Sequence, residues 1–181
     1  MGVLCQKNGR VEVVEYSEIS SELANKRDEA GNLLFNAANI VTHIFTLDAL
    51  EKVCDKADEM PLHLAKKEIK VYDGEKQTSQ WGYKYEYFVF DCFQFLDTFF
   101  ALEVDRFFEF SPIKNKEGDC SPVTAAEQLF KVHRKYLEDA GATIQGDGPC
   151  EISPLLSYSG ESLESYKGAV LVPPVYLPSA D

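Results

Sequence analysis

The segment SPVTAAEQLFKVHRKYLEDAG at residues 121–141 constrains the fold most, because it carries both a start signal and a stop signal for a long helix. Ser121 is a preferred N-cap residue, Pro122 suits the first helical position, and Gly141 suits the position just past the end. The side chains that recur at helical spacing between these signals are Val123, Ala126, Phe130, His133 and Leu137. Such a stripe must pack against another layer, which the flanking segments have to supply.

The flanking segments have the pattern of short strands. At the start of the chain, GVLCQ and VEVVEY are joined by Asn8-Gly9, which predicts a tight hairpin. After Gly141, CEISPLLSY and GAVLVPPVYLP indicate further β segments. The expected order is β-β-α-β-α-β-α-β, which predicts an α/β chain with a mixed sheet and flanking helices.

The middle of the chain contains further signals of both kinds. We expect a short polar helix at residues 20–27, a β-rich run at 33–45, and a helix at 46–58 with Thr46 as its N-cap. The apolar stripe of this last helix is predicted to be Leu47, Leu50, Cys54 and Ala57.

A second turn signal, VYDGEK at residues 71–76, precedes the most aromatic part of the chain. There the pattern predicts a buried helix around residues 88–96, followed by a strand at 99–104. Most of these aromatic side chains are expected in the core.

The charge balance excludes two kinds of partner. The 18 Lys and Arg against 30 Asp and Glu give a net charge of −12, whereas nucleic acids and anionic membranes bind through clustered cations. No apolar run reaches the ~18 residues of a membrane span. We therefore expect no nucleic acid and no membrane as partner.

Cysteine and histidine usage favours a reducing compartment. The 5 cysteines are an odd number at wide spacings without a CxxC motif, which argues against a disulfide framework and a structural zinc site. His43, His63 and His133 lack metal-ligand spacing, so we interpret each as structural or surface. We expect a cytoplasmic protein.

Lys114 is the notable residue of FSPIKN at residues 110–115. Pro112 fixes its own φ and pushes Ser111 toward an extended conformation, so this loop has less freedom than its length implies. Because a cation held in a mostly apolar loop of an acidic chain usually meets an anion, Lys114 is a candidate ligand contact.

Two other positions break the local pattern. Val13 and Glu15 share one strand face, so Glu15 ends an apolar row as either a solvent-facing carboxylate or the rim of a pocket. Asn36 and Asn39 interrupt an apolar run, either as a bulge in which asparagine bonds its own backbone or as a site. With the aromatic cluster at 88–95, these residues are parts of a polar-rimmed pocket that suits a sugar or sugar nucleotide.

Motifs for phosphate loops and for a hydrolase elbow are absent from the sequence. It contains no G-x-x-x-x-G-K-[ST], no G-x-G-x-x-G and no G-x-S-x-G. The chain also starts directly in its first hairpin, so we expect a piece, or a trimmed version, of a longer protein.

Five motifs occur in order along nearly the whole chain: VVEYSEIS at 13–20, LLFNAANI at 33–40, EYFVFDCFQF at 86–95, FSPIKN at 110–115 and EISPLLSYSGESLE at 151–164. In this combination the sequence resembles the eukaryotic UDP-N-acetylglucosamine pyrophosphorylases, also called UDP-N-acetylhexosamine diphosphorylases. The resemblance implies that residues 1–181 are the sugar-binding second half of a Rossmann-like nucleotide-diphospho-sugar transferase domain, ending in a β-rich segment at about 150–181.

The resemblance also implies a reaction and roles for individual residues. The family makes UDP-N-acetylglucosamine and pyrophosphate from UTP and N-acetylglucosamine 1-phosphate with Mg²⁺, whose ligands cannot be identified in this chain. Glu15 would accept hydrogen bonds from sugar hydroxyls, Asn39 would bond the same ring, and Lys114 would meet the phosphates. The implied wall around the N-acetyl group is Tyr16, Phe88 and Phe90.

The chain departs from the family in several places. The family opens with a nucleotide-binding half that carries a Gly-Gly-x-Gly-Thr-Arg loop and a downstream lysine, and both are missing here. Ala38 stands where glycine is usual, which would cost ~1–2 kcal/mol if the backbone there needs a positive φ. Phe107-Phe108 replaces an acidic pair, and Ala126 replaces an arginine.

These departures lead to three hypotheses. The first is a partial UDP-N-acetylglucosamine pyrophosphorylase that is inactive by itself and poorly soluble alone. The second is a pyrophosphorylase for UDP-glucose or a broad set of UDP-sugars, against which the apolar N-acetyl wall argues. The third is a non-catalytic protein that binds sugar nucleotides and derives from the enzyme.

Overall fold

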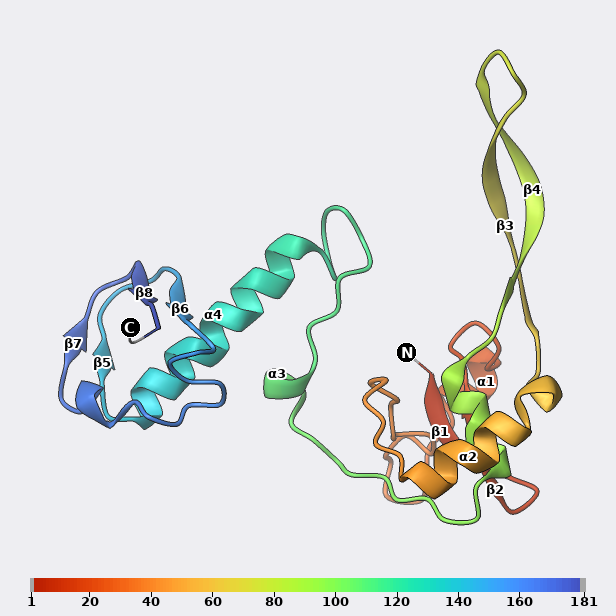
Figure 1. Cartoon of the computed structure of the whole chain (residues 1–181), viewed down its shortest axis with the longest axis horizontal. Coiled ribbons are helices and arrows are strands. Elements are labelled where there is room, and N and C mark those ends of the chain that lie inside the picture. Colours follow the sequence, from red (N-terminus) through yellow and green to blue (C-terminus); the bar gives the residue numbers. More distant parts are fainter. Residues whose placement is uncertain (1, 180–181) are drawn as a thin grey trace. The chain divides into compact units, whose positions relative to one another are not determined.

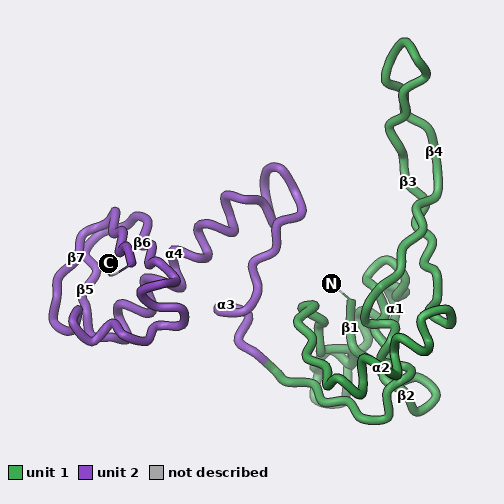
Figure 2. Tube along the Cα trace, in the orientation of Figure 1, with its two compact units in different colours: residues 1–103 green, residues 104–181 purple. Residues whose placement is uncertain are grey.

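The computed structural model describes residues 2–179, and the chain divides into two compact units (Figures 1 and 2). Unit 1 is Met1–Glu103 and unit 2 is Val104–Asp181. Among residues 2–179, no helix combines the length and the apolar composition that crossing a bilayer requires.

The predicted hairpin at the start of unit 1 is confirmed. Strands β1 (Val3–Lys7) and β2 (Arg10–Val14) pair antiparallel, with Lys7 opposite Arg10. Asn8 and Gly9 have φ values of 53° and 79°, the left-handed conformations that a two-residue turn of this kind requires.

A small aromatic core lies where β2 packs against η2 (Val89–Phe95), a 3₁₀ helix. Its buried members are Val13, Phe90, Cys92 and Phe93. The helix expected around residues 88–96 is therefore present and supplies three of these four side chains. The Arg10 guanidinium, which donates to the carbonyl of Gln94, also ties β2 to η2.

A long two-stranded hairpin extends from unit 1, in yellow to green in Figure 1. Its strands are β3 (His63–Tyr72) and β4 (Gln77–Glu86). The predicted turn is confirmed: the Asp73 carboxylate accepts from the backbone N–H groups of Glu75 and Lys76. The aromatic residues on the hairpin are exposed rather than in the core, at 71% for both Tyr72 and Trp81.

The other helices of unit 1 are short: α1 (Ser21–Ala24), α2 (Leu47–Asp55) and the 3₁₀ turn η1 (Ala57–Glu59). Thr46 caps α2 as predicted, accepting from Ala49 N at 3.3 Å. The predicted stripe of α2 is wrong, because Leu47 is 78% exposed and Val53 packs on the core instead. Ala49 and Val53, spaced i and i+4, form the half-buried face.

Two predicted strands are wrong. Residues 33–45 contain only isolated bridges. The backbone of residues 37–39 bonds to residues 2–4, and Asn39 Oδ1 accepts from Val41 N. Residues 99–104 form no strand, since no neighbouring strand within residues 2–179 pairs with them. There Phe99 packs against Phe93 at 4.9 Å, while Phe100 is 89% exposed.

Unit 2 is built around α4 (Pro122–Asp139), which follows the one-turn helix α3 (Arg106–Glu109). Ser121 and Thr124 form a capping box: Ser121 Oγ accepts from Thr124 N, and Thr124 Oγ1 accepts from Ser121 N. Gly141 follows the end of the helix with φ 95°, so both predicted boundaries are confirmed.

Short strands pair in parallel beside α4: β5 (Thr143–Ile144) with β7 (Val170–Leu171), and β6 (Cys150–Ile152) with β8 (Val175–Leu177). The 3₁₀ turn η3 (Glu164–Tyr166) precedes β7. The buried core of this unit is Leu137, Ala142, Cys150, Ile152, Leu163 and Val175. Of the predicted α4 stripe, His133 and Leu137 are buried, whereas Val123 is 64% exposed. The mixed α/β class is confirmed, with the strands described forming four two-stranded sheets.

Candidate functional site

Glu15 and the backbone of Asn39 both lie next to Gly2. Asn39 N donates to Gly2 O at 2.9 Å, and a Cβ placed on Gly2 would lie 2.8 Å from Glu15 Oε1 and 2.7 Å from Val13 Cγ1. No side chain larger than hydrogen fits there without a shift. The structure therefore places each of the two predicted sugar contacts next to Gly2, a residue that sequence reasoning missed.

The Asn39 side chain is 8% exposed and has one uncommitted donor. Its Oδ1 accepts from Val41 N and lies 3.0 Å from His43 Nε2, whereas its Nδ2 has no hydrogen-bond partner within the described chain. Because an amide oxygen only accepts, the His43 ring donates its Nε2–H to it, and burial lowers the pKa of His43. A buried orphan donor costs about 1–3 kcal/mol, which makes it a marker of a site or of strain.

The backbone beside Asn39 is strained. Val41 has φ 66°, an outlier for a β-branched residue, and such a conformation costs about 1–3 kcal/mol. The bond from Val41 N to Asn39 Oδ1 holds this turn, so the predicted bond of asparagine to its own backbone is present. Ala38 is not among the described residues with positive φ, so the cost expected there does not arise and the strain lies at Val41.

Phe88 and Phe90 form a stack with centroids 5.0 Å apart and an interplanar angle of 18°. Phe90 is 5% exposed and belongs to the core, whereas Tyr16, in the turn after β2, is 64% exposed. The structure thus joins two of the three residues of the predicted N-acetyl wall.

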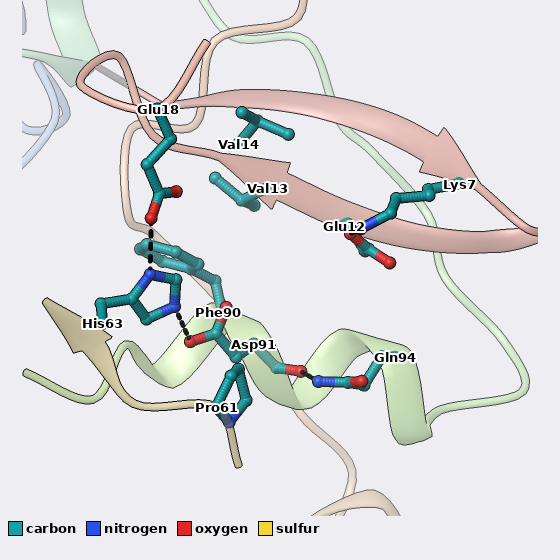
Figure 3. Close-up of a pocket in the computed structure, with 10 residues that line it drawn as sticks. All are labelled: Lys7, Glu12, Val13, Val14, Glu18, Pro61, His63, Phe90, Asp91 and Gln94. Carbon is teal, nitrogen blue, oxygen red and sulfur yellow. Dashed lines mark hydrogen bonds and ion pairs between the residues drawn. The ribbon is translucent and has the colours of Figure 1, made fainter.

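A pocket of about 370 Å³ lies beside this stack (Figure 3). Its lining residues are Lys7, Glu12, Val13, Val14, Glu18, Pro61, His63, Phe90, Asp91 and Gln94. Of the predicted site residues, Phe90 alone lines it. Its polar centre is the half-buried His63, whose Nδ1 lies 2.8 Å from Glu18 Oε1 and whose Nε2 lies 2.8 Å from Asp91 Oδ2.

This arrangement shifts the pKa values of His63 and Asp91, which are both half-buried. Burial by itself lowers the pKa of His63. The hydrogen bonds that the Glu18 and Asp91 carboxylates accept from the ring outweigh burial, so the pKa of His63 is raised. Burial raises the pKa of Asp91, against the opposing contact with His63. Sequence reasoning missed this centre, because its members are 45 and 28 positions apart and no local pattern joins them.

In unit 2, the FSPIKN loop holds the backbone of Lys114 in place. The N–H groups of Lys114 and Asn115 both donate to Cys120 O, at 2.7 and 3.0 Å, and Asn115 Nδ2 donates to Asp119 O at 2.7 Å. Cys120 has φ 56°, a conformation that non-glycine residues adopt only when their surroundings hold it. Lys114 belongs to unit 2 and Glu15 and Asn39 to unit 1, so their convergence stays a prediction.

The residues present do not make up a complete metal site. Within residues 2–179, no three or more His, Cys, Asp and Glu side chains are grouped so as to hold a metal ion. We therefore derive no step through magnesium from this chain's own side chains.

Comparison with known proteins shows the family of this chain. The family model described as UTP–glucose-1-phosphate uridylyltransferase (UDPGP) matches residues 1–147. The UDP-N-acetylglucosamine pyrophosphorylase of Saccharomyces cerevisiae is 42% identical over 180 residues, covering 94% of this chain and 38% of the yeast protein. The human UDP-N-acetylhexosamine pyrophosphorylase-like protein 1 is 43% identical, with 92% of this chain and 38% of that protein covered.

A solved structure agrees with these relatives. A crystal structure from Entamoeba histolytica, described as a UDP-N-acetylglucosamine pyrophosphorylase, superposes with a TM-score of 0.76 at 30% identity and covers 98% of this chain. This chain covers 46% of that protein, so it spans less than half the length of each of these relatives. The chain belongs to the UTP–glucose-1-phosphate uridylyltransferase family.

Proposed function

We propose that this chain is the sugar-binding half of a UDP-N-acetylglucosamine pyrophosphorylase. The observation that carries the proposal is Asn39, a buried residue whose Nδ2 donor has no hydrogen-bond partner within residues 2–179. An amide donor of this kind suits the hydroxyl and ring oxygens of a sugar.

Each candidate residue then has a distinct role. Glu15 accepts hydrogen bonds from sugar hydroxyls, Asn39 donates its free amide hydrogen to the same ring, and Phe88 with Tyr16 and Phe90 walls the acetyl group. Lys114, on its hydrogen-bonded loop, neutralises the phosphate. These groups bind and orient the acceptor sugar phosphate, and positioning supplies much of the rate of phosphoryl transfer.

We propose that the chain does not complete the reaction by itself. A triphosphate needs several cations or a metal, and the chain has a net charge of −12 with Lys114 as its one candidate phosphate contact. Magnesium, which the family implies, would be held by substrate phosphates together with groups outside this chain. A cytoplasmic location would suit the cysteine usage.

The test is isothermal titration calorimetry, which measures the affinity of the purified chain for UDP-N-acetylglucosamine and for UDP-glucose. We expect saturable binding that favours the acetylated sugar. Equal or stronger binding of UDP-glucose would support the second hypothesis, which the description of the matching family model also favours. No heat with either ligand would overturn the proposal.

A matched pair of variants ties binding to Asn39. Asn39→Asp keeps an oxygen for Val41 and His43 but removes the amide donor, and we expect affinity to fall about tenfold, the size of one lost hydrogen bond. Asn36→Asp adds the same charge at an exposed position of the same segment and should bind like the parent chain. A loss of equal size in both variants would show a charge effect instead.

Release of pyrophosphate from UTP and N-acetylglucosamine 1-phosphate with Mg²⁺ tests the inactivity of the chain. We expect no turnover above the uncatalysed background. Robust turnover would refute inactivity while supporting the substrate class.

A further inference from the structure

Three segments that are far apart in the sequence meet at the imidazole of His63 (Figure 3). Glu18 lies in the turn after β2, His63 is the first residue of β3, and Asp91 lies in η2. Both ring nitrogens lie 2.8 Å from a carboxylate oxygen. The ring therefore links the turn after β2, the base of the long hairpin and the aromatic helix.

The chemistry of this bridge requires a shared proton. An ionised carboxylate only accepts hydrogen bonds, and a neutral imidazole has a single N–H. Two contacts at hydrogen-bond distance therefore need an additional proton, which the imidazole is best placed to carry. The His63 and Asp91 side chains are 18% and 10% exposed, so water does little to screen this pair.

Other charged groups around the ring are already paired. In the same pocket, Lys7 Nζ lies 3.3 Å from Glu12 Oε2. Across the hairpin, the residue opposite His63 is Glu86, which accepts from Lys84. The two carboxylates of Glu18 and Asp91 thus dominate the field at the imidazole.

The ring also contacts the aromatic stack. The His63 and Phe88 centroids are 4.6 Å apart, and Phe88 stacks on Phe90. A charged imidazole beside an aromatic ring gains a cation–π attraction that the neutral ring lacks. The protonation of His63 and the orientation of Phe88 are therefore coupled.

We infer that His63 and Asp91 are positioning residues, whose shared proton holds the Phe88–Phe90 stack in the orientation that receives the acetyl group. The role toward the acetyl group rests on the proposed function, whereas the proton bridge stands on the geometry alone. When the proton leaves, one ring nitrogen presents a lone pair to a carboxylate, and the contact becomes repulsive. Sugar binding should then weaken as the pH rises through the raised pKa of His63.

The bridge is tested by nitrogen NMR of the histidine rings in the isotope-labelled full chain. With 3 histidines in the sequence, His43→Gln and His133→Gln assign the His63 signals. Near neutral pH we expect both nitrogens of His63 to carry protons, and we expect Asp91→Asn to move its pKa down. Asp97→Asn removes the same charge at an exposed residue paired with Lys52 and should leave the His63 signals unchanged. A neutral single tautomer in the parent chain, or an unchanged pKa in Asp91→Asn, would overturn the bridge.

The positioning role is tested by the affinity for UDP-N-acetylglucosamine across the pH range. We expect Asp91→Asn to bind about tenfold more weakly at mildly acidic pH, the size of one lost charge-assisted hydrogen bond, and to lose the fall in affinity with rising pH. Unchanged affinity and pH profile would refute the positioning role even where NMR shows the bridge. If the parent chain binds no sugar nucleotide, the proposed function and the positioning role both fail, and the NMR signature still decides the bridge.

Discussion

The two units differ in what stabilises them. Unit 2 has six buried core residues on one side of a doubly capped helix, and Arg134 donates from α4 to the carbonyls of Ile144 and Gly146. Unit 1 has four buried core residues, although it contains more of the chain. It also carries a strained Val41, an orphan amide at Asn39 and the His63 bridge.

This difference concerns strain and unsatisfied polar groups as well as core packing. Strain and unsatisfied polar groups persist only where the surroundings hold them, and they gather at binding sites. Unit 1 concentrates these features around the predicted sugar contacts. Unit 2 also has non-glycine residues with positive φ, at Ser162 and at Cys120, whose turn holds the backbone of Lys114.

The largest expected effect comes from the core of unit 2. Leu137 is 0% exposed, and Leu137→Ala should lower the free energy of unfolding by about 2–5 kcal/mol, the usual cost of such a cavity. Urea denaturation measures the loss, and amide hydrogen exchange locates it. We expect faster exchange at residues 122–177 and unchanged exchange in the core of unit 1; an equal change in both units would contradict their separation.

A smaller effect distinguishes the two helix caps. Ser121→Ala removes a cap that is 1% exposed and should cost about 1 kcal/mol, because Thr124 N loses its acceptor while the bond from the backbone N–H of residue 121 to Thr124 Oγ1 remains. Thr46→Ala should cost less, since α2 has no buried residue that its unravelling would expose. Thermal unfolding of the two variants compares them, and a larger loss for Thr46→Ala would contradict the account.

The units should respond to pH in opposite directions through His63 and His133. The raised pKa of His63 gives stability that is complete below the ordinary value of 6.5 and is lost as the pH rises through the raised value. Burial lowers the pKa of His133, whose Nδ1 accepts from Ile152 N, so its contribution is complete above 6.5 and is lost as the pH falls through the lowered value.

Amide exchange in the two units across this pH range measures the effect. Because burial also lowers the pKa of His43, the comparison is made in a His43→Gln background, so that His63 is the one histidine left in unit 1. The same pH trend in both units would contradict the assignment.

The smallest effect is expected on the long hairpin. Trp81 is 71% exposed, and Trp81→Phe should change the free energy of unfolding by less than about 0.5 kcal/mol, as most surface substitutions do. It keeps an aromatic ring but weakens the cation–π contact with Lys66, whose Nζ lies 5.6 Å from the Trp81 ring. A cost above 1 kcal/mol in urea denaturation, beyond ordinary surface values, would show that the hairpin packs against the rest of unit 1.

Local signals in the sequence predicted the turns and helix ends well. Asn8-Gly9, Thr46, Ser121 and Gly141 each act through hydrogen bonds or dihedrals within a few residues, and all four are confirmed. The errors concern residues that need distant partners. The run at 99–104 has strand composition, but no strand in the described part of the chain pairs with it. The face that α2 buries is set by where the core of unit 1 lies.

The candidate site divides in the same way. Asn39 breaks an apolar run in the sequence, and in the structure its backbone N–H donates to the carbonyl of Gly2, the residue that Glu15 also approaches. The bridge of Glu18, His63 and Asp91 could not be predicted, because only the folded chain brings together residues separated by 45 and 28 positions.

One measurement tests most directly whether the sugar contacts of unit 1 and the loop of Lys114 serve a single ligand: amide hydrogen exchange with and without UDP-N-acetylglucosamine. We expect slower amide exchange at both residues 36–43 and residues 110–120 when the ligand saturates the chain. Slower exchange in one of these segments alone, or in neither, would contradict this account.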